Sequence, residues 1–303
     1  MDIAVIGSNM VDFISYIDKM PKEGETLEAP DFKMGCGGKG ANQAVAAAKM
    51  GSKVMMVTKI GDDIFADNTI KNLESYGIDT EFTSKVPGTS SGVAPIFVDR
   101  ESKNRILIIK GANQYLLPED VDLAAEKLKK CSLIVLQLEI PLQTIYRAIE
   151  FGNKHGIPVV LNPAPASKDL DFDYVCKCDY FIPNESELEL LTGMPVESKE
   201  QMREAAFTLI DKGVKNVIVT MGSRGVMWVT KEKVCTVDSY KVDAIDTTGA
   251  GDAFIGCFAH FFVQNGDVLH AIKMATAFAA LSVTKQGTQT SYPNVKELKQ
   301  FME

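Results

Sequence analysis

Strands and helices alternate regularly from residue 118 onward, and this alternation constrains the fold more than any other feature of the chain. Short apolar runs, typical of buried strands, are separated by stretches long enough for helices of about 10–15 residues. The pattern predicts an α/β fold with a doubly wound, mostly parallel sheet flanked by helices. The expected helices are 118–129, 141–154, 185–192 and 199–212, and the expected strands are 133–138, 158–162, 179–182 and 216–220.

The remainder of the chain adds strands that this alternation does not include. We expect a hairpin from 225–229 and 234–237, strands at 3–7, 54–60 and 80–84, and a helix at 64–76. Short, semi-apolar strand pairs at 13–34 and 92–110, the second a hairpin through 99–104, indicate a small extra sheet. Because no repeat, low-complexity segment or Pro/Ser-rich linker interrupts the chain, we expect a single domain spanning 1–303.

Composition argues against several kinds of partner. A formal net charge of −8 makes nucleic acid or an anionic membrane an unfavourable main partner. No apolar run reaches the length of about 18 residues expected of a membrane helix, and the first residues lack the basic region of a signal peptide. Six scattered cysteines suit reduced thiols better than disulfides, and Cys176 and Cys178 lack the second pair or nearby histidine of a metal site. We therefore expect a cytoplasmic protein.

The stretch Asp246-Thr-Thr-Gly-Ala-Gly-Asp252 leads into an apolar helix and has the features of a phosphate site. Its glycines would let backbone N–H groups approach an anion closely, and the N-terminus of the helix would favour negative charge. Asp252 falls in the first helical turn, where a carboxylate could accept the proton of an attacking hydroxyl. The alternative is an ordinary helix start with an acidic residue near its N-terminus.

A second glycine-rich stretch, from Gly35 to Gly51, carries Lys39 and Asn42 into an alanine-rich helix. It fits neither a Walker A loop nor the dinucleotide-binding glycine pattern. Its small residues would admit either a ligand or a closely packed backbone, and both interpretations remain open.

Polar residues also follow several of the expected strands. Glu139 closes one strand, Asn184 and Glu187 follow another, and a loop containing Gly222 and Gly225 follows a third. Because the carboxyl ends of parallel strands meet at one edge of a sheet, these loops should lie beside Asp252. An Asn and a Glu three residues apart suit Mg²⁺ held largely through water. The three histidines are far apart in helical patterns and are interpreted as structural.

Both glycine-rich stretches resemble signatures of the ribokinase family of sugar kinases, and the resemblance covers nearly the whole chain. The first is Gly37-Gly-Lys-Gly-Ala-Asn-Gln-Ala, and the second is Asp246-Thr-Thr-Gly-Ala-Gly-Asp252. The resemblance implies ATP-dependent phosphorylation of a sugar hydroxyl with Mg²⁺. It further implies that 13–34 and 92–110 supply lid strands over the sugar, which also pair with a second copy in a homodimer.

The resemblance also implies a role for individual residues. Asp252 would be the base, beside an anion hole formed by the N–H groups of Gly249, Ala250 and Gly251. The sugar would contact Asp12, Gly38, Lys39, Asn42, Glu139 and Asp252. The nucleotide would contact Asn184, Thr220, Gly222, Ser223, Gly225, Gly251 and Thr276, with Glu187 ordering Mg²⁺ and its waters. A monovalent cation, expected to be K⁺, would lie between loops containing Asp246, Thr248, Ser282, Lys285, Gly287 and Ser291.

The sequence departs from the family pattern directly after the first strand. Ribokinases carry Gly-Ser-x-Asn-x-Asp there, and this chain has Gly7-Ser8-Asn9-Met10-Val11-Asp12. Met10 replaces the Asn that contacts ribose hydroxyls, and Asn9 should point elsewhere because it is one residue away. The chain thus resembles a family member that phosphorylates the 5-hydroxyl of 2-deoxyribose, with ribose a poorer substrate. Alternatives are a ribokinase proper, another small-sugar or nucleoside kinase, or a non-catalytic sugar sensor.

Overall fold

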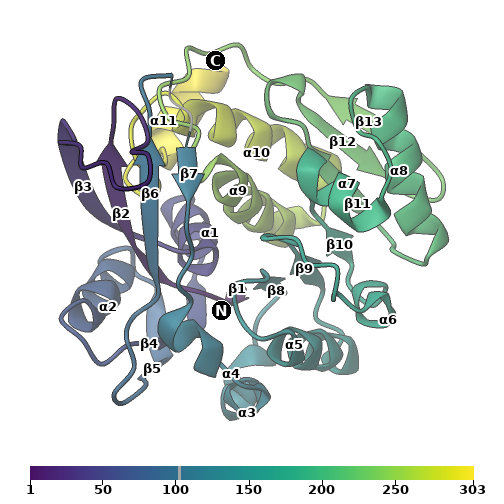
Figure 1. Cartoon of the computed structure of the whole chain (residues 1–303). Helices are drawn as coiled ribbons and strands as arrows, with labels where there is room; N and C mark the ends of the chain where they lie inside the picture. Colours follow the sequence, from purple (N-terminus) through teal and green to yellow (C-terminus); the bar gives the residue numbers. More distant parts are fainter. Residues whose placement is uncertain (102–103) are drawn as a thin grey trace.

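The computed structural model describes residues 1–101 and 104–303 and is built on a nine-stranded sheet (Figure 1). The strand order is β13-β12-β11-β10-β9-β8-β1-β4-β5, and all neighbours from β11 to β5 run parallel. The predicted hairpin of β12 and β13 adds the antiparallel edge. The strands are β1 (Ile3–Ile6), β4 (Val54–Ile60), β5 (Asp79–Lys85), β8 (Leu133–Leu136), β9 (Val159–Leu161), β10 (Tyr180–Phe181), β11 (Val217–Thr220), β12 (Val226–Val229) and β13 (Val234–Val237).

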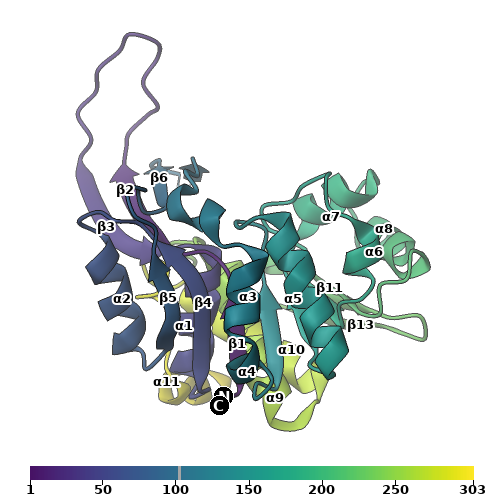
Figure 2. The ribbon, with the colours of Figure 1, turned by 90° about the horizontal axis from the view of Figure 1, so that it is seen from below.

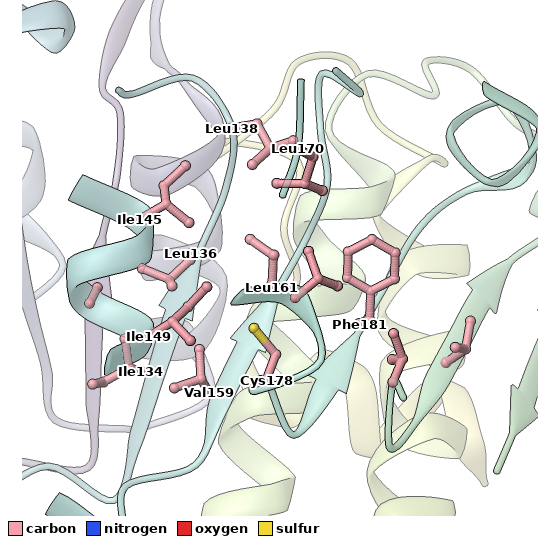
Figure 3. Close-up of a cluster of buried hydrophobic side chains, with 14 of the residues drawn as sticks. Ile134, Leu136, Leu138, Ile145, Ile149, Val159, Leu161, Leu170, Cys178 and Phe181 are labelled. Atoms are coloured by element: carbon pink, nitrogen blue, oxygen red, sulfur yellow. The ribbon is translucent and has the colours of Figure 1, made fainter. Parts of the chain in front are cut away.

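Helices cover both faces of the sheet, because successive side chains of each buried strand point to opposite faces. In β1, Ile3 and Val5 join one apolar cluster while Ala4 and Ile6 join the other. The first cluster is covered by α1 (Lys39–Lys49), α2 (Ala66–Ser75), α9 (Ala250–Asn265), α10 (Val268–Ser282) and α11 (Val295–Met302). The second, part of which Figure 3 shows, is covered by α3 (Pro118–Leu123), α4 (Ala125–Leu128), α5 (Leu142–His155), α6 (Phe172–Val175), α7 (Glu185–Thr192) and α8 (Lys199–Asp211).

A four-stranded sheet stands beside the main one, in the order β3-β2-β6-β7 (Figures 1 and 2). Its strands are β2 (Met10–Tyr16), β3 (Asp31–Gly37), β6 (Val93–Val98) and β7 (Asn104–Ile106). The connection 17–30 projects well beyond the body of the molecule, as Figure 2 shows. The hairpin connection predicted at 99–104 includes 102 and 103, which lie outside the described residues.

Three sequence predictions need correction here. Residues 35–37, predicted as part of a glycine-rich loop, belong to β3, which begins at Asp31. Gly37 suits its place in this strand because a side chain there would clash: a Cβ on Gly37 would lie 2.2 Å from Asp12 Oδ2. The helix predicted at 118–129 is divided at Ala124 into α3 and α4. Helix α2 starts two residues later than predicted, because the Asp63 carboxylate accepts the N–H of Phe65 and holds the preceding turn.

Within the described residues, no helix is both long enough and apolar enough to cross a membrane. All six cysteines are free thiols.

Candidate active site

The N-terminus of α9 lies at the carboxyl edge of the main sheet and carries Asp252 in its first turn. Gly249 precedes the helix with φ of 74°, a conformation that disfavours other residues, and a Cβ there would press on Thr288 and Tyr292. The Tyr292 hydroxyl donates to the Gly249 carbonyl at 3.1 Å. A Cβ on Gly251 would meet open space. The loop is therefore held from behind and open in front, where the N-terminus of α9 favours an anion; the Ala250 N–H already donates to the Thr247 carbonyl at 3.3 Å.

Both oxygens of Asp252 accept hydrogen bonds from the first turn of α1. Asn42 Nδ2 donates to Oδ2 at 3.0 Å, and Gln43 Nε2 donates to Oδ1 at 2.9 Å. The two helices pack closely, since a Cβ on Gly256 would lie 2.3 Å from the carbonyl oxygen of Gln43. The small residues of the stretch from Gly35 to Gly51 therefore allow tight packing, as one of its two interpretations predicted, and this packing brings Asn42 and Gln43 to Asp252.

Two further buried carboxylates lie near Asp252. The Glu139 carboxylate accepts hydrogen bonds from the Ser8 hydroxyl and from the backbone N–H of Lys39, and burial raises its pKa. Burial, and then the charge of Glu139, raise the pKa of Asp12 to about 7. Burial alone would lower the pKa of Lys39, but the surrounding carboxylates, first among them Asp252 and Glu139, raise it. Asp12, Glu139 and Asp252 thus surround the ammonium group of Lys39, and this set of charged acceptors and one donor suits a neutral ligand with several hydroxyl groups.

Met10 and Asp12 lie on the same face of β2, because they are two residues apart along the strand. The Met10 side chain is 2% exposed and packs in an apolar cluster with Ile14, Ala94 and Ile96. The Asn9 side chain turns the other way and donates to the Thr58 hydroxyl and the Lys59 carbonyl. The Asn9 side chain therefore points away from the face that carries Met10 and Asp12, in the direction that the sequence predicted.

A pocket of 160 Å³ opens in front of Thr247, Gly249, Ala250 and Gly251. Asn184 caps α7 by accepting the N–H of Glu187, and Glu187 Oε2 in turn accepts the N–H of Asn184 at 2.8 Å. Burial raises the pKa of Glu187 to about 7. The residues that line the pocket include Lys39, Asn162, Asn184, Glu187, Thr220, Thr247, Gly249, Ala250, Gly251 and Asp252.

The other residues predicted to contact a nucleotide surround this pocket less closely. Gly222 and Ser223 form an exposed turn after β11, and Gly225 is buried at its end with φ of 92°. Thr276 is buried within α10, where its hydroxyl donates to the Ile272 carbonyl at 2.8 Å. None of these four lines the pocket described above.

The two loops predicted to hold a monovalent cation are in contact. Asp246 accepts the N–H of Thr248 through Oδ1 and the N–H of Gly287 through Oδ2, each at 2.9 Å. Ser282 and Ser291 bond to nearby backbone carbonyls, while the Lys285 ammonium turns to Glu297. Asp246 therefore ties the start of the anion-hole loop to the segment after α10.

A larger pocket of 320 Å³ lies between the small sheet, α2 and the segment 286–290. Asp12, Ile14 and Tyr16 line it from β2, Asn72 and Tyr76 from α2, and Gln289 from the C-terminal segment. Asp12 also approaches this segment directly, as the Thr288 hydroxyl lies 3.5 Å from Asp12 Oδ2.

Several residues at this edge escaped prediction. Gln43, Gln137, Asn162 and Gln289 are all buried and belong to hydrogen-bonded chains around Asp252, and Tyr292 supports Gly249. Only two of these residues could have been found from the sequence, because Gln43 follows Asn42 within the first family signature and Gln137 lies near the end of a predicted strand.

Comparison with known proteins shows the family of the chain. A family model described as "pfkB family carbohydrate kinase" matches residues 1–295. The chain belongs to the pfkB family of carbohydrate kinases. It is therefore a sugar kinase, and the resemblance inferred from the two glycine-rich stretches is confirmed.

Individual relatives cover the chain from end to end. A deoxyribokinase of Salmonella typhi is 66% identical over 302 residues, covering 100% of this chain and 99% of its own. A mouse ribokinase is 37% identical, covering 98% of this chain and 93% of its own. The structure of Arabidopsis thaliana ribokinase complexed with ribose and ATP superimposes with a TM-score of 0.91 at 30% identity, covering 100% of this chain and 98% of that one. The predicted fold class is confirmed by this match.

Proposed function

We propose that this kinase transfers the γ-phosphoryl group of ATP to the 5-hydroxyl of 2-deoxy-D-ribose, with ribose as a poorer substrate. The observation that carries the choice of sugar is Met10, buried beside Asp12 where an Asn would serve a ribose hydroxyl. The 66% identity to a deoxyribokinase, against 37% to a ribokinase, supports the same choice. Asp12 and Glu139 remain available to hydroxyls common to both sugars.

Asp252 is the base in this proposal. It accepts the proton of the 5-hydroxyl as the oxygen attacks, while the N–H groups of Gly249, Ala250 and Gly251 stabilise charge that develops on the transferring phosphoryl group. The hydrogen bonds from Asn42 and Gln43 hold the carboxylate without occupying all of its lone pairs. Gly38, Lys39 and Asp12 would position the sugar from the side of the small sheet.

The pocket in front of α9 is assigned to ATP, with Asn184 and Thr220 on its far wall. The described residues contain no group of three or more His, Cys, Asp or Glu side chains placed to ligate a metal directly, which fits Mg²⁺ held mainly by phosphates and water. Glu187, buried with one oxygen bonded to the Asn184 N–H, would order that water shell. Mg²⁺ neutralises phosphate charge when bound.

We also assign K⁺ to the contact between the loops of Asp246 and Gly287, where backbone carbonyls would supply most of its ligands.

The small sheet would form a lid over the sugar. The exposed apolar side chains on that sheet and on the segment after it support a homodimer, because such patches are normally covered. These side chains are Phe32, Met34, Ile106, Leu107 and Ile109. Neither nucleic acid nor a membrane has a role in this proposal, and we place the enzyme in the cytoplasm.

Met10 would select against the 2-hydroxyl by leaving it without a partner. A hydroxyl buried against a thioether loses water and gains at best a weak acceptor, which costs roughly 1–3 kcal/mol, or about 5- to 150-fold. The deoxy sugar has only hydrogen there and fits the apolar cluster of Met10, Ala94 and Ile96. Ribose should therefore be a poor substrate that still reacts.

The test is Met10→Asn, with kcat/KM measured for both sugars, and Met10→Leu as the apolar control. We expect Met10→Asn to gain on ribose and lose on deoxyribose, while Met10→Leu keeps the preference. An unchanged ratio in Met10→Asn would show that Met10 only fills core space and does not read the 2-position.

A further inference from the structure

Two chains of carboxamide side chains converge on the two oxygens of Asp252. In one, Gln137 Nε2 donates to Gln43 Oε1 at 2.7 Å, and Gln43 Nε2 donates to Asp252 Oδ1 at 2.9 Å. In the other, Gln289 Nε2 donates to Asn42 Oδ1 at 3.0 Å, and Asn42 Nδ2 donates to Asp252 Oδ2. Every amide in both chains directs its NH₂ group toward the carboxylate.

The first chain is the more deeply buried of the two. Gln43 is 1% exposed and Gln137 is fully buried. Asn162 anchors the chain from β9: its Oδ1 accepts from Gln43 Nε2 at 3.3 Å, and its Nδ2 donates to the Ile182 carbonyl at 2.9 Å. Burying amides is unfavourable unless their donors and acceptors are paired. The Gln43 amide is paired through both Oε1 and Nε2, whereas Gln137 Oε1 has no hydrogen-bond partner among the described residues. An ionised carboxylate only accepts, so the amide facing Asp252 must present its NH₂ group.

We propose that Gln43, oriented by Gln137, is a positioning residue for Asp252 in phosphoryl transfer. It holds Oδ1 in place, so that a lone pair stays directed at the sugar hydroxyl. The charged groups around Asp252 cannot provide this orientation: Lys39 supplies a countercharge, and Asp12, Glu139 and Glu187 are like charges. The inference rests on the proposed role of Asp252 as the base.

Gln43→Met removes the donor and nearly keeps the shape, and it tests the inference directly. We expect kcat to fall by about 10- to 100-fold, the loss typical of one hydrogen bond to a charged group. KM for sugar and for ATP should stay within about threefold, because Gln43 would act on the base and not on either substrate. Gln137→Met should produce a smaller loss of kcat of the same kind. Asn216→Leu, which breaks a partly buried amide pairing with Trp228 at the opposite end of β11, is the matched control and should keep the wild-type kcat.

The decisive comparison is made in the Asp252→Asn background. If Gln43 acts through the base, adding Gln43→Met should change the residual kcat of Asp252→Asn by less than about twofold. A full additive loss there, or a wild-type kcat for Gln43→Met alone, would overturn the inference while leaving Asp252 as the base. A wild-type kcat for Asp252→Asn would overturn the proposed function as well. Should Gln43→Met not fold, as judged by its melting curve, Gln137→Met carries the same comparison.

Discussion

Asp12→Asn should make the sugar-free protein more stable at neutral and alkaline pH while impairing catalysis. Asp12 is 5% exposed, and burial, followed by the charge of Glu139, raises the pKa of its carboxyl from 3.8 to about 7. The folded protein therefore binds the Asp12 proton more tightly than the unfolded chain does. As a result, ionisation of Asp12 costs folding free energy as pH rises from about 4 to about 7, and the full cost is present above pH 7.

The size of this cost follows from the shift. About three pKa units at 1.36 kcal/mol each give an upper value of about 4 kcal/mol. An Asn keeps the shape, carries no charge at any pH and can still accept from the Thr288 hydroxyl. The variant should thus gain up to about 4 kcal/mol over wild type at pH 8 and only about 1 kcal/mol at pH 4.5. The repulsion between Asp12 and Glu139 is already part of this shift and adds nothing further.

The assay is urea unfolding of the sugar-free protein at several pH values between 4.5 and 8. Asp169→Asn, at an exposed loop position, serves as the control and should follow the wild-type curve at every pH. The same Asp12→Asn protein should lose at least about tenfold in kcat/KM for deoxyribose, because a charged acceptor for a hydroxyl is gone. An equal difference in unfolding free energy at pH 4.5 and pH 8 would refute the reasoning, since a burial cost tied to ionisation must vanish in acid.

Three other predictions concern the base, the cation and the assembly. Asp252→Asn should lower kcat by about 10²- to 10⁴-fold with little change in sugar or ATP binding by calorimetry; retention of more than about a tenth of the wild-type kcat would contradict its role as base. Activity should be higher in K⁺ than in Na⁺, because a cation between Asp246 and Gly287 would fix the anion-hole loop; equal rates in K⁺, Na⁺ and a large organic cation would exclude this. Light scattering should give a dimer at micromolar concentration, and a variant with Phe32→Ser and Met34→Ser should shift toward monomer; a wild-type monomer would count against pairing through the small sheet.

The sequence was sufficient for the main sheet because its pattern and its packing express the same physics. Continuous apolar strands such as Ile3–Ile6 must be buried on both faces, and they are. The same pattern predicted a strand up to Met34 but missed Gly35, Cys36 and Gly37 at the end of β3, because glycine has a low strand propensity. They are extended because they pair with Met10–Asp12 across the small sheet, which is a tertiary contact.

The site shows the same division. The place of Asp252 in the first turn of a helix that follows a glycine-rich turn could be predicted, because this arrangement has a recognisable sequence pattern. The amides could not, because Gln43 and Gln289 are unremarkable residues in a sequence and acquire a role only from the atoms they face. Tyr292 is a similar case, since an aromatic residue before a proline gives no sign that its hydroxyl supports Gly249 from 43 positions away.

The segment from Gly287 to Tyr292 connects the parts of the site that the chain supplies separately. Gly287 binds Asp246, Thr288 lies against Asp12, Gln289 binds Asn42, and Tyr292 binds Gly249. A cation bound at Gly287 would therefore affect Asp12, which we propose contacts the sugar, the proposed base Asp252 and the proposed anion hole, all through the short segment from Gly287 to Tyr292. Its effect should appear in KM for the sugar as well as in kcat, because Asp12 and the loop before Asp252 share this support. A cation that changed kcat alone would mean that Thr288 and Gln289 move independently of Gly287.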